Sequence, residues 1–181
     1  MLLYAATEIQ AQKKEELLKS TARIQEWVTG YRGLEFLRPV PNRIQTKQQT
    51  EQFLKERIDE EFSKEEIVKA ERLLKRLGLL PPDYDYYASM VELMTEQLAG
   101  MYDHKEKFLA LADWLPLEMQ EPVLVHEMTH ALQDQHYGLE KYLSSDITND
   151  DKALALASLV EGDASLVMFA YSMIPQGQKV T

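Results

Sequence analysis

Two histidines and a glutamate lie within five consecutive positions of this 181-residue chain, as His126, Glu127 and His130. On a helix, residues four apart lie on one face about one turn apart, so His126 and His130 could each direct a ring nitrogen at a single metal ion. Glu127 would point about 100° around the helix from His126, outside the ligand set but near a water held by the metal. A carboxylate there can take the proton of this water as it attacks a carbonyl group. The pattern HExxH therefore predicts a zinc-dependent hydrolytic site.

The helix that carries this pattern should be long and largely buried. No residue in 123–137 breaks a helix, most positions around the histidines are uncharged, and Gly138 is suited to end the helix. We expect the helix to begin between Pro116 and Pro122 and to expose only its metal-binding edge. The alternative is a buried helix whose two histidines make ordinary hydrogen bonds, and the candidate ligands downstream favour the metal site.

Two residues could provide the third metal ligand, and each requires a different path of the chain after His130. His136 completes the spacing HExxHxxGxxH of the metzincin peptidases, but Gln133 replaces the glycine that lets the chain leave the helix sharply. If the helix continues to Gly138, His136 lies about 120° around and about 9 Å along the axis from His130. It could not then share the metal.

Glu161 is the second candidate for the third ligand. It lies in the segment ASLVEGDA (157–164), where small residues would let a second helix pack closely on the first. Two histidines and one glutamate, with water in the fourth position, form a standard catalytic zinc set. We therefore expect His126, His130 and Glu161 to bind one Zn²⁺ ion, with Glu127 as the general base.

The segments HEMTHALQDQH (126–136) and LVEGDA (159–164) resemble the gluzincin metallopeptidases, the group with HExxH plus a distant glutamate that includes thermolysin. They are more closely similar to small bacterial proteins with an HE(L/M)THALQDQH helix followed by an EGDA helix. The resemblance covers about residues 95–170. It implies a zincin-like fold and endopeptidase activity, with the same three ligands and the same base.

The sequence departs from the thermolysin-like pattern at the residues that support the metal. Those enzymes have an aspartate four residues after the ligand glutamate, where it orients a ligand histidine, and this chain has Ser165 there. Asp163 or Asp134 could take this orienting role. Thermolysin-like enzymes also stabilise the oxyanion with a later histidine, but no histidine follows His136 here. A tyrosine would have to replace it, and the candidates are Tyr102, Tyr137 and Tyr171.

The composition is that of an ordinary globular domain, with 45% hydrophobic and 28% charged residues. A net charge of −10 argues against nucleic acid as a partner. The lack of cysteine excludes disulfides, a cysteine nucleophile and thiolate ligands for zinc. No segment has the roughly 18 continuous apolar residues of a membrane span, so we expect none. The short apolar start, 1–6, is compatible with a trimmed signal peptide and slightly favours a secreted or periplasmic location.

The other predicted elements are mostly helical. Thr46 can cap one helix, and Ser63 with Glu66 forms a capping box at the start of another. The expected helices, besides the HExxH helix, cover 7–29, 47–61, 63–78, 84–98 and 151–171. Residues 34–44 should be extended, and their two prolines suit an edge strand.

A β-hairpin is predicted directly before the HExxH helix, because 101–113 are typical of two short strands around a polar turn. In zincins a strand in this position forms the upper rim of the active-site cleft. An extended peptide substrate could add to it as an antiparallel strand, held by backbone hydrogen bonds. The alternative is a hairpin that only covers the core.

These patterns predict a predominantly helical α+β chain, with a small sheet beside the HExxH helix. We interpret 1–181 as one zincin-like domain, in which 1–82 form a helical N-terminal part and 83–174 the catalytic core. The predicted function is zinc-dependent hydrolysis of a peptide or protein substrate.

The alternative function is a latent or non-catalytic zinc-binding domain with a binding or structural role. A third reading is a helical interaction protein with a chance motif. The sequence does not indicate an oligomeric state.

Overall fold

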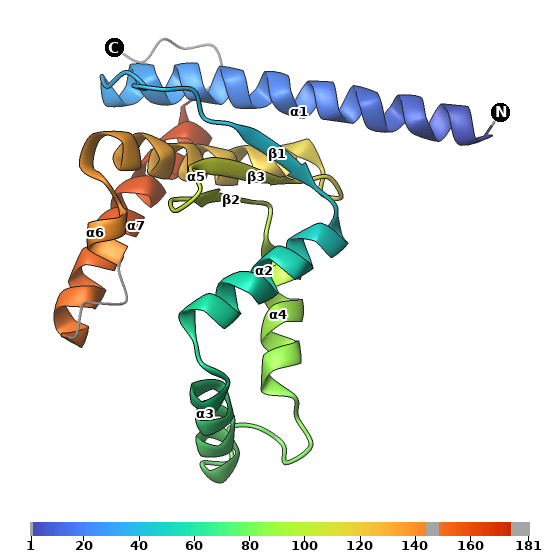
Figure 1. Cartoon of the computed structure of the whole chain (residues 1–181). Helices are drawn as coiled ribbons and strands as arrows, with labels where there is room; N and C mark the ends of the chain where they lie inside the picture. The colour runs from blue at the N-terminus through green and yellow to red at the C-terminus, as the bar shows by residue number, and fades with distance from the viewer. Residues whose placement is uncertain (1, 144–148, 175–181) are drawn as a thin grey trace. The chain divides into compact units, whose positions relative to one another are not determined.

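The computed structural model describes residues 2–143 and 149–174 of the chain (Figure 1). Its elements in chain order are α1 (Leu2–Arg32), β1 (Asn42–Gln45), α2 (Lys47–Glu61), α3 (Lys64–Arg76), α4 (Tyr86–Gln97), β2 (Gly100–Asp103), β3 (Phe108–Ala112), α5 (Leu117–Tyr137), α6 (Glu140–Leu143) and α7 (Asp150–Met173). The predominantly helical α+β class is therefore confirmed. The chain divides into two compact units, one formed by Gln45–Leu98 and the other by Met1–Ile44 with Ala99–Thr181.

Several helix boundaries follow from cap residues in the sequence. Thr46 and Ser63 each accept a hydrogen bond from a backbone N–H in the first turn of the following helix, and the side chains of Gln49 and Glu66 bond back to the cap residues. Gly138 follows α5 with a φ of 68°, a conformation that glycine adopts without steric cost. These contacts confirm the predicted starts of α2 and α3 and the predicted end of the HExxH helix.

The smaller unit contains α2, α3 and α4. Helix α2 packs against α4 through Leu54 and Ile58 on one side and Val91 on the other, all of which are buried. None of the four residues predicted to form the zinc site lies in this unit. The unit joins α4, predicted to be part of the catalytic core, with α2 and α3 of the predicted N-terminal part, so the grouping does not follow the predicted division at residue 82.

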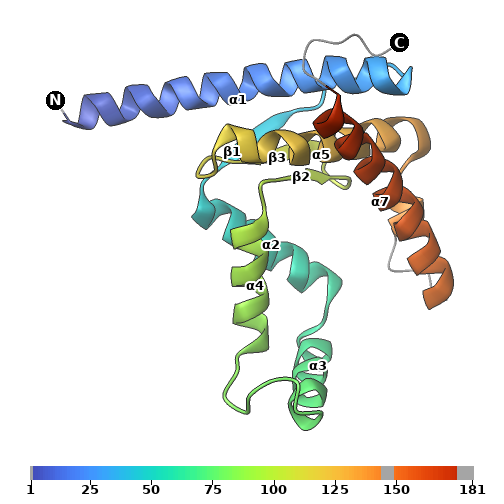
Figure 2. The same ribbon diagram turned by 180° about the vertical axis from the view of Figure 1, so that it is seen from behind.

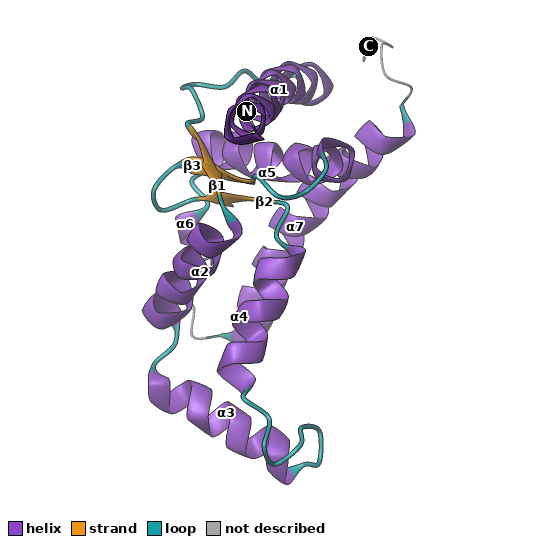
Figure 3. Cartoon of the chain, turned by 90° about the vertical axis from the view of Figure 1, so that its right-hand side faces the viewer, coloured by secondary structure: helices purple, strands orange, loops and turns teal. Residues whose placement is uncertain are grey.

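The larger unit contains a small sheet with the strand order β1-β3-β2 (Figure 3). Strands β2 and β3 pair antiparallel, with Gly100 opposite Leu111 and Asp103 opposite Phe108. This pairing confirms the predicted hairpin. Strand β1 lies at one edge, as the prolines before it suggested, although it is shorter than the predicted 34–44 segment. Strand β2 forms the other edge, next to α5.

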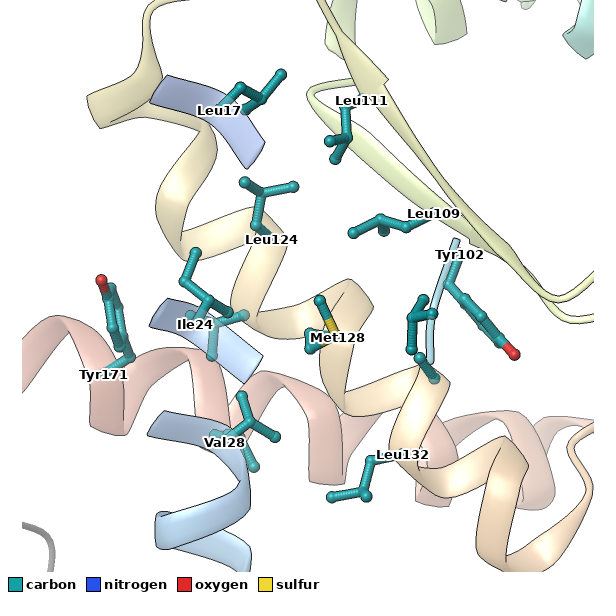
Figure 4. Close-up of a cluster of buried hydrophobic side chains, with 14 residues drawn as sticks. Leu17, Ile24, Val28, Tyr102, Leu109, Leu111, Leu124, Met128, Leu132 and Tyr171 are labelled. Carbon is teal, nitrogen blue, oxygen red and sulfur yellow. The ribbon is translucent and has the colours of Figure 1, made fainter. Parts of the chain in front are cut away.

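Helix α5 lies at the centre of the larger unit, with α1, α7 and the hairpin packed against it (Figure 2). Leu124, Met128 and Leu132 recur every four residues along α5 and form one buried stripe (Figure 4). The side chains that complete this core come from α1, β2, β3 and α7, and include Leu17, Ile24, Val28, Tyr102, Leu109, Leu111 and Tyr171. Helix α1 is therefore part of the core around the HExxH helix.

Helix α7 carries its apolar residues on two sides. Val160, Ala164 and Val167 are buried, whereas Leu166 and Phe169 are well exposed. By length and composition alone, α7 could cross a membrane, and it is the one such helix among the described residues. The same helix packs against α5 and carries Glu161 and Asp163, so this feature by itself assigns no membrane span.

A buried carboxylate joins the hairpin to the end of α5. The Asp134 side chain is fully buried and accepts hydrogen bonds from the Tyr102 hydroxyl at 2.8 Å and from the Leu139 N–H at 3.0 Å. The ammonium group of Lys107 lies 2.9 Å from it. Burial would raise the pKa of Asp134, but the hydrogen bonds from Lys107, Leu139 and Tyr102 outweigh burial and hold this pKa below its usual value.

Replacing Asp134 with asparagine should therefore destabilise the protein at neutral pH, by about 1.5–3 kcal/mol as for other hydrogen bonds to charged groups. A carboxylate with a lowered native pKa stabilises the fold above its unfolded pKa of about 3.9, and this contribution is lost as the pH falls through the native pKa. Urea unfolding of wild type and Asp134→Asn at several pH values measures the effect. The difference in stability should stay constant down to about pH 4 and then shrink. Equal stability at pH 7 would contradict it.

Candidate metal site

Three potential metal ligands from two helices meet at one point. His126 and His130 lie one turn apart on α5, and Glu161 lies on α7. The Nε2 atom of His126 is 3.0 Å from the Nε2 atom of His130 and 3.0 Å from Oε2 of Glu161. The third side of this triangle, from His130 Nε2 to Glu161 Oε2, is 3.5 Å. The structure thus brings the three residues of the predicted ligand set together.

The dimensions of this triangle fit a small tetrahedral ion. Four ligands at a zinc distance of 2.0–2.1 Å lie about 3.3 Å from one another. The observed separations of 3.0, 3.0 and 3.5 Å are close to one face of such a tetrahedron. The donor set of two imidazoles and one carboxylate is also one that zinc prefers, and the fourth position would remain open to water. The three side chains therefore fit a single small metal ion.

His136 lies away from this point. Helix α5 continues without a break through Tyr137, and the Nε2 atom of His136 is 2.8 Å from the carbonyl oxygen of Glu35. Within the described part of the chain, His136 is not a member of any group of side chains that could hold a metal. The helix therefore continues past Gln133, as expected if Glu161 and not His136 is the third ligand.

The pKa values of the three candidate ligands are shifted by burial and by their closeness to one another. Burial is the largest cause that lowers the pKa of His126, and the neighbouring His130 adds to it. The hydrogen bond with His130 is the largest cause that lowers the pKa of Glu161. Burial would lower the pKa of His130, but Glu161 and Glu127 together raise it. A metal ion would compete with a proton for His130.

Glu127 projects toward strand β2. Its Oε2 atom accepts a hydrogen bond of 2.7 Å from the backbone N–H of Tyr102. Burial raises the pKa of Glu127 to about 7, and the charge of His130 and the Tyr102 N–H oppose this shift. Gly100 allows the strand to come this close, because a Cβ atom there would lie 3.2 Å from Leu124 and 4.0 Å from the Glu127 side chain.

The backbone of β2 presents polar groups on the side away from β3. The hydrogen bonds Ala112 N–H to Ala99 O and Lys107 N–H to Asp103 O show which residues face β3. Residues whose backbone groups bond to the partner strand alternate along an antiparallel strand, so the backbone N–H and C=O groups of Gly100 and Tyr102 face away from β3. The contact between the Tyr102 N–H and Glu127 agrees with this pattern. The outer edge of β2 therefore runs beside the residue predicted to be the general base.

The support of His130 comes from a residue that the sequence did not indicate. The Nδ1 atom of His130 lies 2.9 Å from Oε1 of Gln133, and Nε2 of Gln133 donates to Asp163 at 2.8 Å. Asp163, a candidate for the orienting role, thus reaches the histidine only through Gln133. Asp134, the other candidate, instead holds the hairpin. Residues three apart on a helix are neighbours, so the spacing of His130 and Gln133 could have indicated this contact.

Two of the three tyrosines considered for oxyanion stabilisation have hydroxyl groups engaged elsewhere. The Tyr102 hydroxyl donates to Asp134, and burial is the largest cause that raises its pKa far above the usual value. The Tyr171 hydroxyl donates to Glu121 at 3.1 Å. Tyr137 is half exposed at the end of α5, with its ring beside that of His136.

Comparison with known proteins adds no assignment: no family model, curated protein or solved structure matches the sequence. The assignment of the site therefore depends on its residues and their geometry.

Removing the third ligand should distinguish Glu161 from His136. We expect Glu161→Ala to lose most of its zinc, because only two protein ligands remain, and His136→Ala to retain about one zinc per chain. Elemental analysis of both folded variants after dialysis measures this. Retention of zinc by Glu161→Ala together with its loss from His136→Ala would instead assign a metzincin-like site.

Zinc removal should also destabilise the larger unit. An ion that joins α5 to α7 binds only the native state, and a free concentration of about 100 times Kd adds roughly 2.7 kcal/mol of stability. A chelator should therefore lower Tm by several degrees, and Glu161→Ala should show no such response. If a chelator extracts zinc from the wild type at unchanged Tm, the ion does not link the two helices.

Proposed function

We propose that this protein is a zinc-dependent metallopeptidase, with His126, His130 and Glu161 as ligands and Glu127 as the general base. The observation that carries the proposal is the triangle of donor atoms with sides of 3.0, 3.0 and 3.5 Å, formed by two helices. Its size and chemistry suit zinc, and Glu127 is next to the first ligand in the sequence. The resemblance of 126–136 and 159–164 to the gluzincins supports the same class and a zincin-like fold.

The roles of the residues follow from their positions. Zinc, when bound, supplies Lewis acidity that polarises a carbonyl group and lowers the pKa of a water molecule. The Tyr102 N–H donates to Oε2 of Glu127, which would leave Oε1 to receive a proton. Glu127 would take a proton from the attacking water and deliver it to the leaving amine. Burial raises the pKa of Glu127 to about 7, which favours a group that must first accept a proton and then release it near neutral pH.

Strand β2 is the element suited to hold the substrate. It lies at the edge of the sheet, and the backbone groups of Gly100 and the carbonyl of Tyr102 face away from β3. An extended peptide could pair with this edge and bring a peptide bond beside Glu127. The proposed substrate is therefore an unstructured segment of a peptide or protein.

A latent or non-catalytic zinc domain is the alternative function. One observation favours it: the Tyr102 N–H, which belongs to the same edge of β2, already donates to Glu127. In such a protein Glu127 would serve to hold the hairpin, and zinc would stabilise the packing of α5 on α7. The two functions agree on the zinc site and differ on whether Glu127 transfers a proton.

Replacing Glu127 with glutamine tests the catalytic role. Glu127 is not one of the three ligands, so Glu127→Gln should retain zinc, whereas the loss of proton transfer should slow hydrolysis by about 10²–10⁴-fold. The measurement is cleavage of casein by the zinc-loaded wild type and variant, with zinc content determined in the same samples.

Glu118→Gln is the matched control, because Glu118 is exposed in the first turn of the same helix. It should cleave casein at the wild-type rate. Equal cleavage by wild type and Glu127→Gln would assign the activity to a contaminant or another site. Zinc binding by a wild type that cleaves neither casein nor unstructured peptides would favour the non-catalytic function.

A further inference from the structure

Gln133 connects the two helices behind the candidate metal site. It lies on α5 one turn after His130 and is 7% exposed. Its Oε1 atom is 2.9 Å from Nδ1 of His130, and its Nε2 atom lies 3.2 Å from the carbonyl oxygen of Val160 and 2.8 Å from Oδ2 of Asp163. A single amide thus makes three hydrogen bonds that join a candidate ligand on α5 to two residues of α7.

The surroundings of this amide determine which of its ends faces the histidine. The carbonyl of Val160 can only accept a hydrogen bond, and so can the carboxylate of Asp163, which is paired with Arg32 at 2.8 Å. These two acceptors match the two hydrogens of the Gln133 amide nitrogen. The reverse orientation would place the amide oxygen against both acceptors and would lose both hydrogen bonds. The oxygen of Gln133 therefore faces His130.

An oxygen that can only accept requires a donor on the ring. Nδ1 of neutral His130 must then carry the hydrogen, which leaves the lone pair on Nε2. Nε2 is the atom that lies 3.0 Å from His126 and 3.5 Å from Glu161, so the lone pair points toward the other two ligands. This is the tautomer that a metal ligand at that position needs.

We propose that Gln133 is a positioning residue that fixes the tautomer and ring orientation of His130 before metal binds, and that Asp163 and Arg32 fix Gln133 in turn. The proposal rests on the zinc site proposed above. It assigns the orienting role to a neutral amide, whereas the sequence had suggested Asp163 or Asp134 for this role. The charge of Asp163 is balanced by Arg32 and separated from the histidine by the amide, so the support adds little charge beside the metal.

Zinc affinity measured by competition with a chromophoric chelator tests this role. Gln133→Leu keeps the bulk of the side chain and removes the acceptor, and it should weaken zinc binding by about 10–100-fold. The matched control is Gln135→Leu on the same helix. Gln135 also makes three hydrogen bonds, to the backbone of Leu37 and Arg38, but does not touch the site. Its affinity for zinc should equal that of the wild type.

An exchange of the two polar groups provides a rescue. In the double variant Gln133→Glu with Asp163→Asn, the new asparagine can donate to the new carboxylate, which still accepts from Nδ1 of His130, and the total charge is unchanged. Because the Val160 carbonyl loses its donor in this variant, we expect the double variant to recover part of the zinc affinity lost in Gln133→Leu. Failure of the exchange to restore affinity, in a folded protein, would contradict an orienting role.

Nitrogen-15 NMR of the histidine side chains gives a readout that needs no metal. In the zinc-free wild type, neutral His130 should carry its hydrogen on Nδ1. A hydrogen on Nε2 would overturn the proposal, as would wild-type zinc affinity in Gln133→Leu, and either result would leave the zinc site itself intact. If Gln133→Leu does not fold, the tautomer of the wild type and the double variant decides the question. A wild type that binds no zinc would instead refute the proposed function.

Discussion

The unbroken course of helix α5 after His130 determines where every other part of the site must lie. Because the helix continues to Tyr137, His136 is carried round to the carbonyl of Glu35. A third ligand must then come from a separate element, and α7 packed against α5 provides it. The sharp turn that would bring His136 back needs a glycine, and Gln133 occupies that position. The same residue that keeps the helix intact also fills the space behind His130.

Close approach of α5 and α7 places Glu161 beside the histidines. Ala164 on α7 is completely buried, and a side chain this small lets the two helix backbones come near each other. Val160 and Ala164 face inward, whereas Glu161 lies at the border of the buried stripe with its side chain 56% exposed. A carboxylate at such a border can reach a metal from the edge of the core without the cost of full burial. A larger residue at 164 would move Glu161 away from both histidines.

The parts of this arrangement that the sequence predicted depend on local rules. The caps at Thr46 and Ser63, the end of α5 at Gly138 and the hairpin before α5 each follow from residues adjacent in the chain. The convergence of Glu161 with the histidines was also predicted, because few residue types can complete such a ligand set. Helix α6 was not among the predicted helices, since a single turn has too few residues to show periodicity.

Other contacts could not be predicted because they join residues far apart in the sequence. The membership of α1 in the core depends on Ile24 and Val28 joining one cluster with Leu124, about a hundred positions later, and an apolar stripe does not reveal its partner. The same holds for the Arg32–Asp163 pair and for the contact of Gln133 with α7. The sequence also suggested Tyr102 as a group for the oxyanion, whereas the structure gives its hydroxyl to Asp134. A tyrosine in an apolar strand carries no sign of its acceptor.

Tyr102 aligns the edge strand with the HExxH helix through both ends of the residue. Its backbone N–H donates to Glu127 and its hydroxyl donates to Asp134, seven positions further along α5. Seven residues are about two turns, so these acceptors lie on one face of the helix and about 10 Å apart along its axis. Because these two hydrogen bonds are about two turns apart, together they fix the direction of the Tyr102 side chain along α5. A single hydrogen bond could not do this. Tyr102 therefore contributes both to the direction of β2 beside the candidate site and to the orientation of Glu127.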